Sequence, residues 1–120
     1  MNAWLNLREL IDLANKETAY KDLDELSQKV LEWVCMQHNP KANLFVQAIV
    51  LDSKIASPAT IHKCLATLER TGFLNFVVDS EDARRRIVSP SAKASKTLEA
   101  LDRRVIKWVK KRRAKEKELT

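Results

Sequence analysis

The sequence predicts a mainly α-helical fold with one small β-hairpin, and three features of the chain support this. Apolar residues recur at helical spacing through most of its 120 residues. One glycine and three prolines leave room for few tight turns. Between Phe73 and Ser89 the helical spacing gives way to short aromatic and β-branched runs, which favour strands.

The N-terminal part, residues 1–38, is predicted to form two helices. The second begins with Asp22 at the N-cap and Glu25 at N3, a pair that resembles a capping box. It ends before Pro40, because proline cannot continue a helix. The first helix covers residues 3–14 and places an apolar stripe on one side: Trp4, Leu7, Leu10, Ile11 and Ala14.

Two further helices are predicted in the next part of the chain. The first is short and apolar, from about Leu44 to Asp52. The second covers residues 58–71 and begins with a hydroxyl N-cap, Ser57, followed by a proline where no amide donor is needed. Gly72 closes it, because a left-handed residue there satisfies the last carbonyls. The buried stripe of this helix consists of Ile61, Cys64, Leu65 and Leu68.

A β-hairpin and a long helix complete the chain. Strands are predicted over residues 73–78 and 86–89, separated by a polar loop and ended by Pro90. The long helix runs over residues 91–118. Two helices joined by a turn and followed at once by a hairpin form a winged helix-turn-helix. We therefore expect a single domain of residues 1–120, with the helix-turn-helix and wing at 44–89 and flanking N- and C-terminal helices.

Charge is distributed unevenly along the chain. Residues 1–60 carry 6 Lys/Arg and 8 Asp/Glu, a net −2, whereas residues 61–120 carry 16 and 8, a net +8. A basic half suggests a polyanionic partner, although a solubilising surface has the same signature. Neither a membrane-spanning run nor a signal pattern is present, so we expect a cytoplasmic protein without a membrane partner.

Catalytic and metal-binding patterns are weak in this sequence. It contains no Ser/His/Asp set and no Gly-rich phosphate loop, which argues against an enzyme and against a bound cofactor. His62 and Cys64 would point to opposite sides of one helix, and Cys35 with His38 supplies only two ligands. We expect both cysteines to be core thiols, with redox sensing or metal binding as the alternatives.

The segment from about Val46 to Ala94 resembles the DNA-binding lobe of MarR-type transcriptional regulators. The resemblance is carried by "SPATIHKCLATLERTGFL" and by "DSEDARRRIVSPSAKA". It implies a recognition helix at 58–71 for the major groove of double-stranded DNA and a wing at 79–86 for the flanking backbone or minor groove. The chain departs from the family at Glu81, where arginine is frequent, and no predicted element matches the family's usual extra C-terminal helix.

Site residues follow from this resemblance and from exposed polar positions. The predicted DNA-binding residues are Ser57, Thr60, His62, Lys63, Thr67, Arg84, Arg85 and Arg86. Asp79 and Asp82 are predicted to brace the wing, Asp82 through a bidentate pair with an arginine. The alternative is that Asp82 and Arg84 merely close a surface turn.

The terminal helices offer more apolar surface than a small lobe can cover, so we expect a homodimer. A small-molecule effector pocket between Trp33, Trp108 and the N-terminal helix is the alternative to a core role for these tryptophans. For the whole chain, the alternative function is a winged-helix module that binds protein or RNA without reading an operator. The predicted dimer interface consists of Trp4, Leu7, Ile11, Leu101, Val105 and Trp108.

Overall fold

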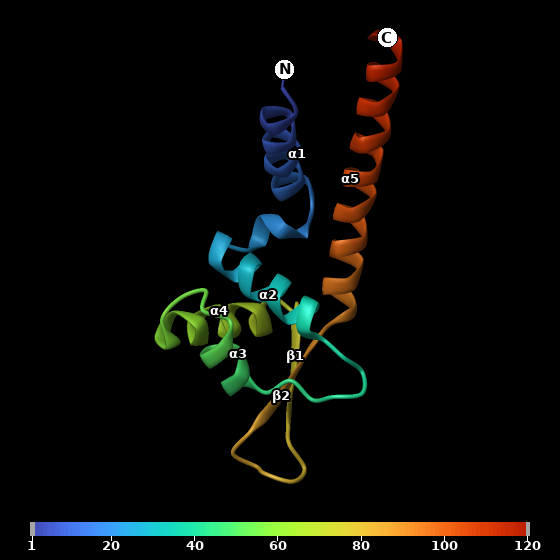
Figure 1. The fold of residues 1–120 in the computed structure, drawn as a ribbon. Coiled ribbons are helices and arrows are strands. Elements are labelled where there is room, and N and C mark those ends of the chain that lie inside the picture. Colours follow the sequence, from blue (N-terminus) through green and yellow to red (C-terminus); the bar gives the residue numbers. More distant parts are fainter. Residues whose placement is uncertain (1, 120) are drawn as a thin grey trace. The chain divides into compact units, whose positions relative to one another are not determined.

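The structure is a computed structural model that describes residues 2–119. Within that range it contains five α-helices, one 3-10 helix and a two-stranded hairpin, as the sequence predicts for a mainly α fold with a wing (Figure 1). The elements in chain order are α1 (Ala3–Glu17), η1 (Ala19–Asp22), α2 (Glu25–Gln37), α3 (Val46–Asp52), α4 (Pro58–Arg70), β1 (Leu74–Val78), β2 (Arg86–Pro90) and α5 (Ala92–Leu119).

The chain forms two compact units. Unit 1 joins the residues up to Lys21 to those from Lys96 onward, and unit 2 consists of Asp22–Ser95. Unit 2 therefore contains the helix-turn-helix, the hairpin and the first turn of α5. That the chain behaves as a single domain stays a prediction.

The core of unit 2 lies where α2 packs on α4 and on β2, and where α3 packs on α4. The predicted stripe of α4 is buried, which confirms its inward face. Side chains from these three helices and from the hairpin form this core. The apolar face of α4 therefore packs against the core, and its opposite face is exposed to solvent. The largest fully buried side chains of the unit are Phe73, Leu31, Ile49, Ile61, Leu65, Leu68, Val30, Val34 and Val88.

Helix α2 begins two residues later than predicted. Its N-cap is Asp24, whose carboxylate accepts hydrogen bonds from the Ser27 amide at 3.2 Å and the Ser27 hydroxyl at 2.6 Å. The Ser27 hydroxyl bond holds the pKa of Asp24 below its ordinary value. The prediction of Asp22 as the cap was wrong, because Asp22 ends η1, a 3-10 turn that buries Tyr20. Glu25 is consequently the first helical residue and not N3.

Helix α3 also begins later than predicted, at Val46. Leu44 and Phe45 are extended because they add to the edge of the hairpin: the Leu44 carbonyl accepts from the Val88 amide at 2.8 Å, and Phe45 forms a β-bridge with Ile87. Periodicity of apolar residues could not distinguish this edge segment from the first turn of a helix.

The turn between α3 and α4 contains a residue with left-handed backbone. Lys54 has φ +54°, a conformation that usually selects glycine or asparagine. Ser57 then caps α4 as predicted, accepting from the Thr60 amide at 3.3 Å. The turn between α3 and α4 therefore ends at the N-cap Ser57, and its left-handed position is occupied by Lys54.

The C-terminus of α4 has the predicted glycine closure. Gly72 has φ +81°, its amide donates to the Glu69 carbonyl at 3.1 Å, and the Phe73 amide donates to the Leu68 carbonyl at 2.9 Å. These two bonds are those of a Schellman motif. Because Phe73 completes this cap, β1 begins one residue later than predicted, at Leu74.

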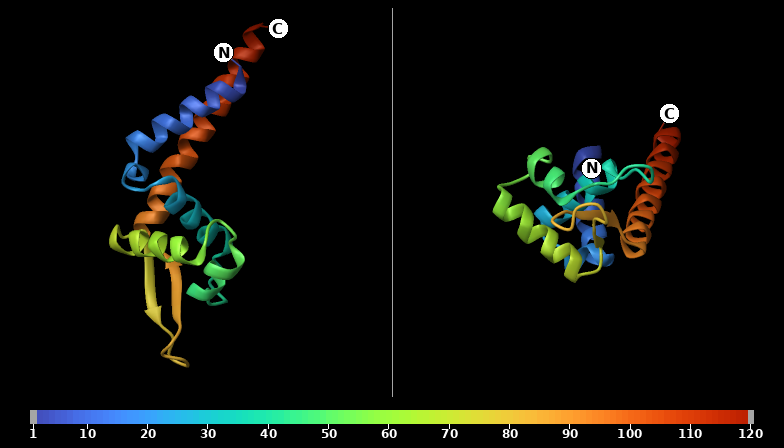
Figure 2. Two further views of the ribbon diagram at one scale, coloured as in Figure 1. Left: turned by 90° about the vertical axis from the view of Figure 1, so that its left-hand side faces the viewer. Right: turned by 90° about the horizontal axis from the view of Figure 1, so that it is seen from below.

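The hairpin extends away from the helices of unit 2 (Figure 2). Its strands are antiparallel, with Leu74 opposite Pro90 and Val78 opposite Arg86. Pro90 is the last paired residue, where a missing amide donor is tolerated. At the base of the hairpin, the Ser91 hydroxyl donates to the Gly72 carbonyl at 2.6 Å, which joins the end of α4 to the start of α5.

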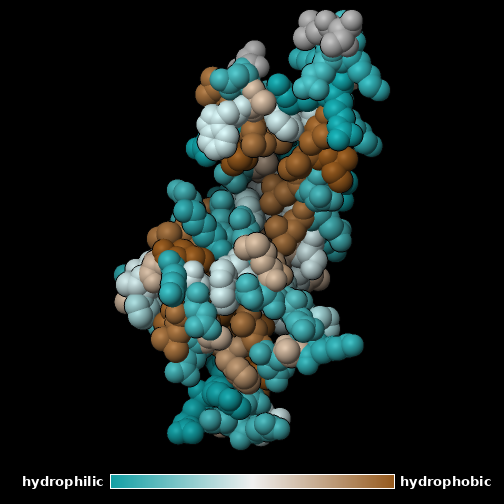
Figure 3. All heavy atoms as spheres, in the orientation of Figure 1, coloured by the Kyte–Doolittle hydropathy of each residue, from teal (hydrophilic) through white to brown (hydrophobic). Residues whose placement is uncertain are grey.

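In unit 1, α1 and α5 lie side by side in opposite directions (Figure 1). Asn6 Oδ1 near the start of α1 accepts from Trp108 Nε1 at 2.7 Å, and Glu17 at its end pairs with Arg104 at 3.0 Å. Helix α1 continues three residues beyond the predicted end at Ala14. Hydrophobic surface is visible over α5 in Figure 3. The exposed large apolar side chains of the two helices are Trp4, Leu5, Ile11, Leu13, Val105, Ile106 and Val109.

Candidate nucleic-acid interface

The outer face of α4 is polar, basic and free of carboxylates over its first three turns. His62 and Lys63 are exposed, and Lys63 forms no ion pair with any side chain described between residues 2 and 118. Glu69 is the first carboxylate along the helix. Small side chains, Ala59 and Ala66, are exposed beside these cations. Such a face allows close approach of a groove and presents donors to it.

The hydroxyl groups predicted to face DNA are partly engaged within the helix. Ser57 Oγ donates to Thr60 Oγ1 at 3.0 Å and accepts from the Thr60 amide. Ser57 is exposed, whereas Thr60 and Thr67 are half-buried. These hydroxyls border the exposed cations on the same helix and retain acceptor capacity for a ligand.

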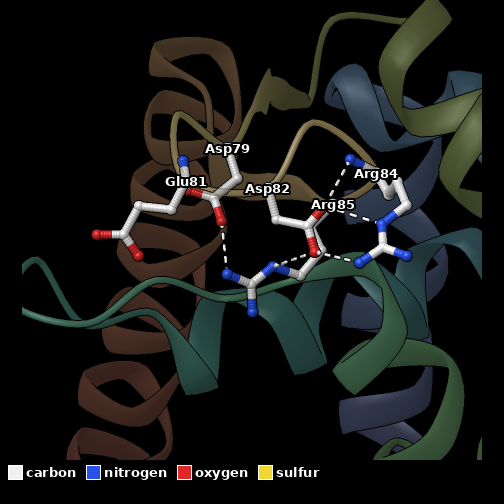
Figure 4. A network of polar contacts seen from close by, with 5 residues as sticks. All are labelled: Asp79, Glu81, Asp82, Arg84 and Arg85. Carbon is white, nitrogen blue, oxygen red and sulfur yellow. Dashed lines mark hydrogen bonds and ion pairs between the residues drawn. The ribbon is translucent and has the colours of Figure 1, made fainter.

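Each arginine of the wing, defined as residues 79–86, is held in a different way, and Figure 4 shows the contacts of Arg84 and Arg85. Arg84 forms the predicted bidentate pair with Asp82, with Nε 3.1 Å from Oδ1 and Nη2 3.3 Å from Oδ2. The Arg84 side chain is nevertheless 91% exposed. Its hydrogen bonds hold the pKa of Asp82 below the ordinary value, so this carboxylate is ionised at neutral pH.

The other two arginines contact residues outside the wing, and Arg85 also contacts residues within it. Arg85 Nη2 lies 2.7 Å from Asp79 Oδ2, and its guanidinium carbon is 4.3 Å from the centre of the Phe45 ring. Arg86 Nη1 lies 3.7 Å from Glu69 of α4. The partners Glu69 and Phe45 were missed in the sequence, because no local spacing connects them to the wing.

A hollow of about 500 Å³ connects the two predicted DNA-binding elements. Its apolar lining comes mainly from α3 and the N-cap residue of that helix, and its polar lining includes His62 of α4 and the three wing arginines. The structure therefore brings the recognition helix and the wing to one continuous surface. The apolar lining residues are Phe45, Val46, Val50, Leu51 and Pro58.

The predicted dimer residues belong to unit 1 and differ in exposure. Trp4 is 67% exposed, and Ile11 and Val105 are also exposed. Leu7, Leu101 and Trp108 are half-buried, the last through its bond to Asn6 on α1. Exposure of this kind is compatible with an interface between chains, and the interface stays a prediction.

Neither thiol belongs to a metal-ligand set formed by the described residues. Cys64 is buried, as expected for a core thiol, and Cys35 is half-buried. Burial, assisted by the charge of Glu32, raises the pKa of the Cys35 thiol. Across the described residues, no three His, Cys, Asp or Glu side chains converge to hold a metal ion. In the same range, every helix is too short or too polar to cross a membrane.

Comparison with solved structures identifies the class of this fold. No protein-family model and no curated protein matches the sequence. An S. aureus MepR–DNA complex matches with a TM-score of 0.72 and 17% identity, over 95% of this chain and 87% of that one. A mutant of S. aureus MepR bound to an oligodeoxyribonucleotide gives 0.75 and 18%, over 96% and 84%. PcaV from Streptomyces coelicolor, in complex with its natural ligand, gives 0.58 and 19%, over 85% and 69%.

These matches define a winged helix-turn-helix protein. More narrowly, the chain has the fold of the MarR-type regulators, which confirms the resemblance seen in the sequence. The likeness extends over most of the chain, whereas the sequence motifs covered only residues 46–94. The flanking helices α1 and α5 thus belong to the same fold although their sequences carry no motif.

Proposed function

We propose that this protein binds double-stranded DNA in a sequence-specific manner and acts as a small transcriptional regulator. The observation that carries the proposal is the outward face of α4, which presents His62 and Lys63 without a neighbouring carboxylate beside the wing arginines. A helix with this face suits the major groove, and cations on a wing suit the flanking phosphates or the minor groove. The MepR complexes with DNA, which share the fold, support this reading.

The position of each side chain determines which part of the DNA it would contact. Lys63 and His62 would reach base edges or nearby phosphates from the middle of α4. Ser57, with nearby amides at the N-terminus of α4, would suit a phosphate, and the threonine hydroxyls would contact phosphates or thymine methyl groups. The wing would add its three arginines. We assign no catalytic activity and no cofactor to this arrangement.

We further propose that two copies assemble through their terminal helices. Exposed apolar side chains on α1 and α5, among them Trp4, Ile11 and Val105, would be covered by such contact. A two-fold dimer would place two α4 helices about one turn of DNA apart. DNA as the partner would place the protein in the cytoplasm. The liganded PcaV structure is compatible with an effector, for which this chain supplies no assigned site.

Selection from a random duplex library tests the proposal directly. Wild-type protein should enrich one motif with two-fold symmetry, whereas a Lys63→Ala variant should enrich it weakly. Lys29→Ala, which removes an exposed lysine of α2, is the matched control and should enrich like wild type. Absence of any enriched motif from folded wild-type protein would contradict operator recognition and favour a protein- or RNA-binding module.

A further inference from the structure

Arg85 is the most constrained of the wing arginines. Its guanidinium pairs with Asp79 at 2.7 Å and lies 3.8 Å from Asp82. The guanidinium carbon is also 4.3 Å from the centre of the Phe45 ring, within the range of a cation–π contact. Its side chain is 41% exposed, less than half the value of Arg84. A side chain with these three contacts has little freedom to follow a phosphate.

Asp79 is built into the start of the wing loop. It is 6% exposed, and its amide donates to the Arg85 carbonyl at 2.9 Å. Its two carboxylate oxygens have separate partners: Oδ1 accepts from the Glu81 amide at 3.2 Å, and Oδ2 accepts from Arg85 (Figure 4). One oxygen therefore shapes the turn and the other holds the arginine.

Phe45 connects this pair to the helix-turn-helix. It is the N-cap residue of α3, and its backbone bridges to Ile87 of β2. The base of the wing is thus joined to α3 through the backbone, and the loop is joined to the same residue through the side chain of Arg85.

We propose that Arg85 is a positioning residue, which together with Asp79 and Phe45 holds the wing against α3 before DNA binds. This role replaces direct phosphate contact for Arg85 and leaves Arg84 as the cation that meets DNA at the wing tip. The inference rests on the proposed DNA binding. Its physical content is preorganisation: a wing already held in place loses less conformational freedom when the complex forms.

The proposal makes an unusual prediction for Asp79→Asn. This change removes a negative charge from a DNA-facing loop, so long-range electrostatics alone would strengthen binding. Asparagine can still accept from the Glu81 amide, but it cannot form the ion pair with Arg85. If the pair positions the wing, binding should weaken, by roughly five- to tenfold, the scale of losing a phosphate-contacting arm.

Glu81→Gln is the matched control. It removes the same charge two residues away, from a side chain that lies outside the Asp79–Arg85 pair. It should leave affinity unchanged or raise it by about twofold through the electrostatic effect. Opposite signs for two equal charge changes separate positioning from simple electrostatics.

The experiment measures binding isotherms on the selected duplex for wild type, Asp79→Asn, Arg85→Lys and Glu81→Gln, each with and without Arg84→Ala. Arg85→Lys keeps the charge, so a phosphate contact would survive it, whereas the planar stack on Phe45 would not. We expect both Asp79→Asn and Arg85→Lys to weaken binding with an unchanged salt slope. Their cost should largely vanish in the Arg84→Ala background, because the wing then has little left to position.

Two results would overturn the inference: Asp79→Asn binding as tightly as Glu81→Gln, or a cost that is the same with and without Arg84. A general loss of folding would produce the second result, and urea unfolding of each variant identifies it. Wild-type protein that binds no duplex would instead remove the proposed function. In that case amide exchange of the free protein still decides whether Asp79→Asn loosens residues 80–86, and unchanged exchange there would exclude the positioning role itself.

Discussion

In α4, His62 and Lys63 face solvent with no carboxylate partner among the described residues, whereas each arginine of the wing is paired: Arg84 with Asp82, Arg85 with Asp79, and Arg86 with Glu69. The two regions therefore present positive charge in different ways. The lysine retains its rotamers until a ligand arrives, and the arginines are oriented in advance.

This difference suggests a division between specificity and affinity. A flexible donor on a helix inserted in the major groove can select among base edges. Cations fixed on a loop reach phosphates or the minor groove, which carry little sequence information. We therefore expect changes in α4 to alter which duplex is preferred, and changes in the wing to alter all affinities together.

The largest effect should come from a substitution in the core against which α4 packs, and it should be an effect on stability. Leu65 is 2% exposed, so Leu65→Ala should lower the free energy of unfolding by about 2–5 kcal/mol through lost burial and a cavity. Urea denaturation measures this loss. The control is Leu51→Ala on α3, an exposed leucine that should change stability by less than about 0.5 kcal/mol. Equal losses for the two leucines would contradict the packing described for α4.

Lys63→Ala should have the next largest effect, on binding rather than on folding. Loss of a base contact should cost about 1–3 kcal/mol on the preferred duplex and flatten the discrimination against a scrambled one. Isotherms on both duplexes measure the difference, with Lys29→Ala as control. If the Lys63→Ala variant still distinguished the preferred duplex from the scrambled one as wild type does, Lys63 would not contact a base.

Arg84→Ala should have a smaller and more uniform effect. Because the wing meets backbone or minor groove, affinity should fall by a similar factor on preferred and scrambled duplexes. The slope of log K against log[salt] should decrease in magnitude by about one. If Arg84→Ala lowered affinity for the preferred duplex alone, the wing would contribute to specificity, which contradicts the roles proposed for α4 and the wing.

The smallest expected effect is that of acid, which should weaken an ion pair of the wing and has no carboxylate to protonate in the first three turns of α4. The Arg84 bonds lower the pKa of Asp82 from its ordinary 3.8, so this pair contributes stability above that pH and loses it as pH falls through the lowered value. The first three turns of α4 contain no carboxylate. NMR titration of the Asp82 carboxyl should therefore give a pKa below 3.8, with wing amides following it. A pKa at or above 3.8 would show that the pair does not persist in solution.

Local signals made α4 predictable from the sequence. Its cap at Ser57 and its closure at Gly72 lie within or next to the helix, and so does the buried stripe between them. The Asp82–Arg84 pair was predictable for the same reason, because its members are two residues apart. Competing local signals account for the wrong cap of α2, where Asp22 and Asp24 both precede an apolar run.

Contacts between distant segments were not predictable. Arg85 contacts Phe45, which lies 40 positions earlier in the sequence. Arg86 at the start of β2 pairs with Glu69 of α4. No spacing rule joins such residues, since the chain brings them together only when the hairpin folds against α3 and α4. The extended form of Leu44 and Phe45 has the same origin, a tertiary pairing with β2 that overrides apolar periodicity.

The central claim, that α4 and the wing bind duplex DNA, is tested most directly by a salt titration of wild-type binding to the selected duplex. With roughly 5–8 phosphate contacts per dimer, the slope of log K against log[salt] should be about −4 to −7. The preferred duplex should remain favoured over a scrambled one at every salt concentration, since base contacts release few ions. A flat titration, or equal affinity for both duplexes, would contradict the account.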